Sequence, residues 1–262
     1  MLPSKGPTIV KLDDVRCPHC SHNFDAGGVK TAELLGEVKG MHPGPNKSGV
    51  RLPVKIPACR FALRGDLCVP EFASGLVLFA HGSGSSRLSP RNQHVAEVLC
   101  DAGLATLLVD LLTEKEEALD AVTKELRFNI SMLADRLVDI IDWLAISKET
   151  EGLKIGLFGA STGAAAALIA ATRRSKWVNA VVSRGGRPDL AGNDLRKVAV
   201  PTLLIVGGED LQVLALNEKA LAAMACPKEL VVVPGATHLF EEPGTLEQVA
   251  MLAQSWFSKY LR

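Results

Sequence analysis

Residues 155–163 read Ile-Gly-Leu-Phe-Gly-Ala-Ser-Thr-Gly, an apolar run that ends in the pattern G-x-S-x-G. The run Lys154–Phe158 is typical of a buried strand, and the alanine-rich stretch Ala164–Ala171 is typical of a helix. A strand, a sharp turn and an immediate helix are the context that this pattern requires. The glycines that flank the turn let the two backbone segments approach closely. The stretch therefore predicts that Ser161 stands at a strand tip, in the position of a nucleophile.

The chain from residue 50 onward alternates apolar runs with amphipathic stretches. This alternation predicts βαβ units, a mostly parallel central sheet flanked by helices, and chemistry at the carboxyl ends of the strands. The segment between Ser183 and Thr202 is too short for a large cap domain. We expect a hairpin in which Val54–Leu63 and Leu67–Val69 pair across Arg64-Gly65-Asp66, further strands at Gly75–Ala80, Ala105–Leu112, Val178–Ser183, Thr202–Val206 and Glu229–Val233, and helices at Asn92–Ala102, Ser131–Ile146, Val213–Cys226 and Thr245–Leu261.

The composition is that of a soluble globular protein. The 262 residues are 47% hydrophobic and 22% charged, and the formal net charge is zero. A neutral balance gives no sign of a nucleic-acid partner, and the longest apolar run is too short to span a bilayer. The N-terminus lacks the apolar core of a secretory signal. We expect a cytoplasmic protein that acts on a small molecule without a cofactor; the sequence does not give its oligomeric state.

The first part of the chain differs from the rest, because residues 1–49 are rich in Gly, Pro, Lys and Asp. We expect an N-terminal extension of unassigned role over residues 1–49, with a strand at Thr8–Lys11, and one α/β domain over residues 50–262. The run Cys17-Pro-His-Cys20 is half of a zinc-ribbon pattern without a second half, so a metal site and two ordinary thiols both stay open. Most other cysteines lie among apolar residues and are expected in the core, and no disulfide framework is evident.

Two further polar residues follow expected strands. Asp210 comes after Thr202–Val206, and His238 comes after the last strand. Asp210 could simply cap the next helix, and Glu209 is a rival acid. However, Ser161, Asp210 and His238 occur in the order nucleophile, acid, histidine, each after its own strand, which is the order of a Ser-Asp-His triad in an α/β-hydrolase fold.

The loop after the expected strand Gly75–Ala80 supplies small residues that could bind an oxyanion. It reads His81-Gly82-Ser83-Gly84-Ser85-Ser86. We expect the backbone N–H groups of Ser83 and Thr162 to form the oxyanion hole, with His81 and Gly82 near the substrate. A phosphate-binding loop is disfavoured, because neither a P-loop ending nor a full G-x-G-x-x-G is present.

Several arginines follow these strand ends. Arg184 and Arg187 follow Val178–Ser183, and Arg87 and Arg91 follow the small-residue loop. A guanidinium suits carboxylate or phosphate recognition, so one or more of them, Arg184 and Arg187 foremost, could bind an acidic group of the substrate. The alternative is that they form structural ion pairs or face water.

Four segments together resemble serine-type members of the dienelactone-hydrolase-like α/β-hydrolases. They are the small-residue loop, the G-x-S-x-G run, Ser183–Leu190 and Pro234–Phe240. The resemblance covers residues 50–262 and implies Ser161, Asp210 and His238 as the triad. Well-known dienelactone hydrolases carry a cysteine where this chain has Ser161. We therefore expect a serine hydrolase that cleaves carboxylic esters of small or accessible acyl groups through an acyl-enzyme. The alternatives are a lactonase, dienelactone hydrolase or thioesterase with the same triad, or a non-catalytic ligand-binding protein of this fold.

Overall fold

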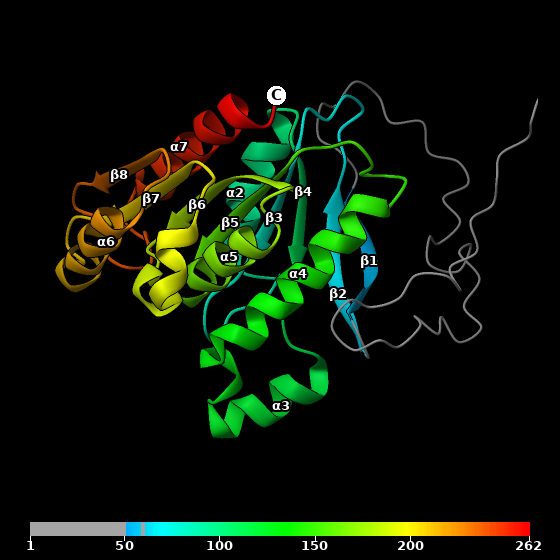
Figure 1. The fold of residues 1–262 in the computed structure, drawn as a ribbon, viewed down its shortest axis with the longest axis horizontal. Helices are drawn as coiled ribbons and strands as arrows, with labels where there is room; N and C mark the ends of the chain where they lie inside the picture. Colours follow the sequence, from blue (N-terminus) through cyan, green and yellow to red (C-terminus); the bar gives the residue numbers. More distant parts are fainter. Residues whose placement is uncertain (1–50, 59–60) are drawn as a thin grey trace, which may run out of the picture.

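The central feature of the computed structural model, which describes residues 51–58 and 61–262, is an eight-stranded sheet of order β1-β2-β4-β3-β5-β6-β7-β8 (Figure 1). The pairs from β4–β3 through β7–β8 are parallel, while β2 is antiparallel to both of its neighbours, β1 and β4. The predicted mostly parallel sheet is confirmed. The strands are β1 Arg51–Ala58, β2 Phe61–Cys68, β3 Leu76–Ala80, β4 Ala105–Val109, β5 Ile155–Ala160, β6 Val178–Arg184, β7 Thr202–Gly207 and β8 Lys228–Val233.

Helices cover both faces of the sheet, and each face has its own apolar core. On one face α2 and α7 pack over a cluster that includes Phe79, Phe158 and Phe257. On the other face α4 and α5 pack over a cluster that includes Leu78 and Leu157. Both faces of the central strands are thus buried, which explains their continuous apolar runs. The helices are α2 Pro90–Asp101, α3 Glu114–Thr123, α4 Ile130–Ile146, α5 Thr162–Arg173, α6 Leu211–Ala223 and α7 Thr245–Tyr260.

The predicted hairpin exists, but its predicted turn is wrong. β1 ends at Ala58 and β2 begins at Phe61, so Arg64-Gly65-Asp66 lies inside β2. Gly65 serves packing there, because a Cβ on it would lie 3.0 Å from the side chain of Leu107 and 3.1 Å from that of Ile56. A glycine between charged residues is typical of a turn, which is why the sequence suggested one.

Two short segments extend beyond the sheet near its carboxyl edge. Residues 188–197 form the 3-10 segment η3 between β6 and β7. The helix α3 and the 3-10 turn η2 (Leu126–Phe128) lie between β4 and α4, and α3 projects away from the body of the sheet (Figure 1). A capping box at Thr113 and Glu116 begins α3. Within residues 61–262 no large cap domain interrupts the strands and helices.

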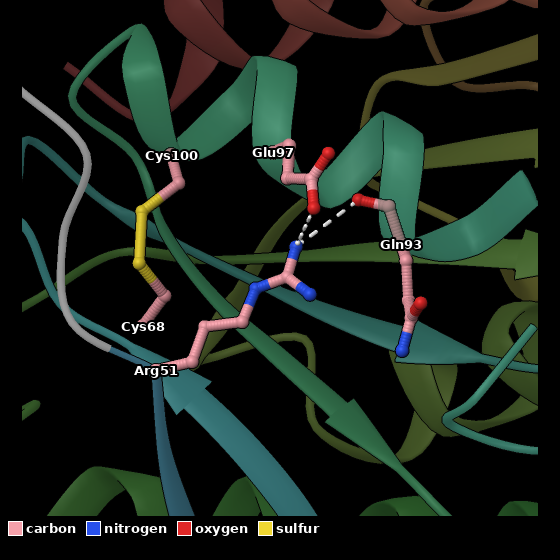
Figure 2. The surroundings of a disulfide bond; sticks show 5 residues. All are labelled: Arg51, Cys68, Gln93, Glu97 and Cys100. Atoms are coloured by element: carbon pink, nitrogen blue, oxygen red, sulfur yellow. Dashed lines mark hydrogen bonds and ion pairs between the residues drawn. A yellow bond between two sulfur atoms is a disulfide. The ribbon is translucent and has the colours of Figure 1, made fainter. Parts of the chain in front are cut away.

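A disulfide joins Cys68, the last residue of β2, to Cys100 of α2, with their Cα atoms 6.8 Å apart (Figure 2). On the same side, Arg51 donates hydrogen bonds to Glu97 and to the carbonyl oxygen of Gln93. These contacts tie α2 to the antiparallel edge of the sheet. The expectation of no disulfide is therefore wrong at this pair; Cys226, by contrast, is a free thiol in the core as expected.

Three predictions fall outside the described residues. They are the strand at Thr8–Lys11, the N-terminal extension over residues 1–49 and the metal pair Cys17 and Cys20. In residues 51–58 and 61–262, no group of three or more His, Cys, Asp and Glu side chains is arranged to hold a metal ion. None of the helices over the same residues has the length and apolar character needed to cross a membrane.

Candidate active site

Ser161 occupies the sharp turn between β5 and α5. Its φ of 50° and ψ of −120° are unusual for a residue with a side chain. Its backbone N–H donates to the carbonyl oxygen of Arg184 at 3.2 Å, and its own carbonyl oxygen accepts from Ala164 and Arg187. These three bonds hold the strained turn in place. The predicted strand–turn–helix geometry is therefore present at Ser161.

The two glycines of the pattern allow this turn because each lies against backbone. A Cβ on Gly163 would overlap the carbonyl oxygens of Ala80 and His81, and a Cβ on Gly159 would overlap the backbone of Ala164. Any side chain at either position would push α5 away from β5 or from the end of β3. The glycines thus bring the N-terminus of α5 directly against the loop that follows β3.

Asp210 and His238 meet at the carboxyl edge of the sheet. Nδ1 of His238 lies 2.6 Å from Oδ2 of Asp210. A carboxylate only accepts hydrogen bonds, so Nδ1 carries the proton and Nε2 is left as the basic nitrogen. Asp210 stands at the N-cap of α6 but makes no side-chain capping bond, and the rival Glu209 is exposed. Of the two acids, Asp210 is therefore the one bonded to the imidazole.

The backbone between β6 and η3 separates Ser161 from His238. Ser161 bonds to the carbonyl of Arg184, and a Cβ on the next residue, Gly185, would lie 3.6 Å from Cε1 of His238. Gly185 has a φ of +51°, a conformation that favours glycine. Ser161 and His238 therefore flank the same short stretch of chain.

The loop after β3 lies against the Ser161 turn. A Cβ on Gly82 would lie 3.0 Å from Cβ of Ser161, and the hydroxyl oxygens of Ser83 and Thr162 are 3.0 Å apart. Thr162 is the first residue of α5, where backbone N–H groups have no acceptor within the helix. The two residues predicted to form the oxyanion hole are therefore neighbours, and the dipole of α5 adds partial positive charge beside Ser161.

His81 fixes the course of this loop. Its Nε2 accepts the backbone N–H of Leu111 at 3.0 Å, and its Nδ1 lies 3.0 Å from the carbonyl oxygen of Gly82. Both ring nitrogens are thus engaged within the protein. The ring therefore has no nitrogen left to offer a substrate, and a contact of His81 with substrate through its other atoms stays a prediction. Burial lowers the pKa of His81, which keeps the imidazole neutral.

His81 should make the protein less stable in acid. Its folded pKa lies below its ordinary value near 6.5, so the folded state resists a proton that the unfolded chain accepts. The contribution of the neutral His81 to the free energy of unfolding is complete above about pH 6.5. It is lost as the pH falls through the folded pKa, by at most about 1.4 kcal/mol per pH unit. Denaturant melts of wild type and His81→Gln from pH 7 to pH 4.5 measure it. On acidification the free energy of unfolding of wild type should fall more than that of His81→Gln. Two curves of unfolding free energy against pH that run parallel would contradict this.

A buried acid that was not predicted from the sequence also anchors the loop. Asp110, which follows β4, accepts the backbone N–H of Arg87 at 2.8 Å and pairs with its guanidinium. Arg87 also pairs with Asp66 of β2. Because Asp110 and Arg87 are remote in sequence, no local pattern connects them. The loop is therefore held from β2 and β4 together.

A cavity of about 230 Å³ opens beside the loop and the first turn of α5. Its walls include Thr162, the serines of the loop, and residues from the segment that contains α3 and η2. Leu112 and Leu133 supply apolar wall, while Glu117 and Arg127 supply charge. Burial, together with the charge of Asp110, raises the pKa of Glu117. The sequence analysis assigned no site residue to this segment, so these wall residues were missed.

Three of the four candidate arginines are occupied by carboxylates. Arg187 donates two hydrogen bonds of 2.8 Å to Asp189, which is the ion pair that the sequence left open as an alternative, and a role in binding substrate stays a prediction. Arg87 pairs with Asp110 and Asp66, and Arg91 pairs with Glu241. Arg184 is different. It is buried, and among the described residues neither its Nε nor its Nη1 has a hydrogen-bond partner.

Comparison with known proteins agrees with this fold. The crystal structure of a dienelactone hydrolase from Anabaena variabilis is 57% identical in sequence, with a TM-score of 0.81, and the match covers 82% of this chain and all of that one. Est1E from Butyrivibrio proteoclasticus shares the fold at 16% identity, with a TM-score of 0.66 over 81% of this chain and 98% of its own.

A Mycobacterium tuberculosis protein named as a phosphoribosyl transferase is 58% identical over 208 residues, which is 79% of this chain and 46% of that protein. The chain thus spans about half the length of the curated relatives it matches. The model of the dienelactone hydrolase family matches residues 70–260, which include β3, the Ser161 turn, Asp210 and His238. This chain is a member of the dienelactone hydrolase family, with the α/β-hydrolase fold.

Proposed function

We propose that this chain is a serine hydrolase that cleaves carboxylic esters of small or accessible acyl groups through an acyl-enzyme. The observation that carries the proposal is the strained turn at Ser161, bonded to the Arg184 carbonyl next to Gly185, against which lies an imidazole whose Nδ1 is 2.6 Å from the carboxylate of Asp210. A hydroxyl is a poor nucleophile until a base accepts its proton, and Nε2 of His238 is that base. Family membership supports hydrolysis as the reaction class.

The proposed reaction has two halves. In the first, the oxygen of Ser161 attacks the ester carbonyl carbon, His238 takes the hydroxyl proton, and the proton then passes to the departing alcohol. In the second, a water attacks the acyl-enzyme, His238 takes a proton from it, and the acid leaves as Ser161 regains its proton. Asp210 holds the imidazole and stabilises its positive charge. The N–H groups of Ser83 and Thr162 bind the oxyanion in both halves.

In this proposal the acyl group enters the cavity that is lined by Ser83 and Thr162 but not by Ser161 itself, and the size of that cavity favours small acyl groups. About 230 Å³ is below the ~300–1,000 Å³ of sites that enclose drug-sized ligands. We expect kcat/KM for nitrophenyl esters to be highest for acyl chains of acetyl to butyryl size and to fall by about tenfold or more at dodecanoyl. The measurement is a chain-length series under one set of conditions. A steady rise to long chains would contradict the small-acyl specificity, and no turnover of any ester would favour the ligand-binding alternative.

A lactonase, dienelactone hydrolase or thioesterase would use the same three side chains, so the same assay with a lactone and a thioester ranks these alternatives. We do not propose phosphoribosyl transfer, because the relatives that carry that name are about twice as long as the region they share with this chain.

Residues 1–49 remain proposed as an extension to the hydrolase domain. A cytoplasmic location also stays a proposal, and the disulfide between Cys68 and Cys100 counts against it, since such bonds persist mainly in oxidising compartments.

A further inference from the structure

A buried asparagine connects the helix that follows the candidate acid to the chain beside Ser161. Asn217 lies in α6, two turns after Asp210, which is the N-cap of that helix. Its side-chain nitrogen donates to the carbonyl oxygen of Gly186 at 2.9 Å and to that of Val213, one turn earlier in α6, at 2.8 Å. The residue is fully buried. Its amide is therefore held out of water, against the loop that follows β6.

The surroundings of this amide fix its orientation. Both neighbouring groups are carbonyl oxygens, which only accept hydrogen bonds, so the NH2 group of Asn217 has to face them. Its own Oδ1 is buried and has no hydrogen-bond partner within residues 51–58 and 61–262, which is costly to the folded protein. The carbonyl of Val213 lies inside α6, where the helix supplies its own N–H donor. The bond to Gly186 is therefore the contact that an apolar side chain at position 217 would lose.

Gly186 belongs to the short stretch 184–187, which holds the Ser161 turn by two hydrogen bonds. Before Gly186, the carbonyl oxygen of Arg184 accepts the N–H of Ser161 at 3.2 Å. After it, the N–H of Arg187 donates to the carbonyl oxygen of Ser161 at 3.0 Å. Gly186 itself is packed so closely that a Cβ on it would lie 1.9 Å from the hydroxyl oxygen of Ser183. A shift of this stretch would therefore disturb both bonds of the turn together.

The same stretch lies against the imidazole of the candidate triad. A Cβ on Gly185 would lie 3.1 Å from the carbonyl oxygen of His238 and 3.6 Å from its Cε1. Nδ1 of His238 is bonded to Asp210, from which α6 begins. The hydrogen bond between Asn217 and Gly186 thus completes a ring of contacts. The ring runs from the acid along α6 to the stretch 184–187, and back to the acid through the imidazole.

We propose that Asn217 is a positioning residue of the triad, whose amide holds the stretch 184–187 at the distance from α6 that aligns Ser161 with His238. The proposal rests on the proposed hydrolase function. Asn217 is buried and its amide is bonded to backbone, so it acts through the carbonyl of Gly186 and not on the substrate. Displacements of about 1 Å at a reacting centre cost about a hundredfold in rate, so loss of this bond should lower kcat and leave KM nearly unchanged.

Asn217→Leu tests the proposal, because leucine has a similar size and no donor. With a short nitrophenyl ester, at a temperature where the variant is fully folded, kcat should fall by about tenfold to a hundredfold and KM should stay within about twofold. The matched control is Thr202→Val, which removes the bond of another fully buried side chain, to the carbonyl of Val200, at the amino end of β7. It should lower Tm by a similar amount and retain kcat. If Asn217→Leu does not fold, Asn217→Ala replaces it with the same expected loss. An unchanged kcat, or an equal fall in kcat in the control, would overturn the proposal.

Amide hydrogen exchange separates this proposal from the question of ester cleavage. The amides of Ser161 and Arg187 make the two bonds of the turn, and those of β3, which is paired on both sides, report the stability of the whole sheet. In Asn217→Leu the first two should exchange about tenfold faster relative to β3 than in wild type, whereas Thr202→Val should keep the wild-type ratio. An unchanged ratio in Asn217→Leu would overturn the positioning role. If wild type cleaves no ester, the hydrolase proposal fails, while the exchange ratio still decides whether Asn217 holds the turn.

Discussion

Ser161→Ala should lower kcat for ester hydrolysis by about 10⁶-fold, the loss expected when a triad loses its nucleophile. The reason is that no other hydroxyl replaces the one at the strained turn that begins α5. KM should change little, since the methylene and backbone of the turn stay in place. The measurement is steady-state hydrolysis of a short nitrophenyl ester by the purified variant.

Two controls give this loss its meaning. Ser161→Ala should fold with the same melting behaviour as wild type, because alanine fits the same volume. Ser74→Ala removes a serine hydroxyl that bonds to the carbonyl of Gly103, far from the turn in sequence, and should retain full activity. Comparable rates in wild type and Ser161→Ala would mean that the hydrolysis uses another group.

Asp210→Asn should lower kcat by about 10⁴-fold. The asparagine amide can donate to Nδ1 of His238, which favours the tautomer with the proton on Nε2. That tautomer cannot accept a proton from Ser161. The variant keeps the size of the side chain, so KM and the melting temperature should stay near those of wild type.

The matched control for Asp210→Asn is Glu209→Gln, an equal change of charge one residue earlier at an exposed position. It should leave kcat within about twofold of wild type, as expected for a surface substitution. If Glu209→Gln were the damaging change and Asp210→Asn were silent, the choice between the two acids would be reversed.

The strand, turn and helix around Ser161 could be predicted from the sequence because each depends on neighbouring residues. An apolar run, a glycine on each side of the serine and an alanine-rich stretch are local signals. The positions of Asp210 and His238 followed from one rule of parallel sheets, that polar residues after strands gather at the carboxyl edge. Their 2.6 Å contact agrees with that expectation.

The features that were predicted wrongly or left open depend on partners remote in the chain. Gly65 looked like a turn residue, but its lack of a side chain accommodates Leu107 on a strand brought alongside by folding. Arg91 and its partner Glu241 are 150 positions apart, so their pairing could not be read from spacing. The same holds for the disulfide between Cys68 and Cys100, which are separated by 32 positions.

The most direct test of the central proposal is covalent labelling with a fluorophosphonate, which reacts with activated serines. We predict that intact-mass analysis of wild type shows one added label, that peptide mapping places it on Ser161, and that Ser161→Ala takes up none. The absence of label on wild type, or label on a residue other than Ser161, would contradict the assignment of Ser161 as the nucleophile.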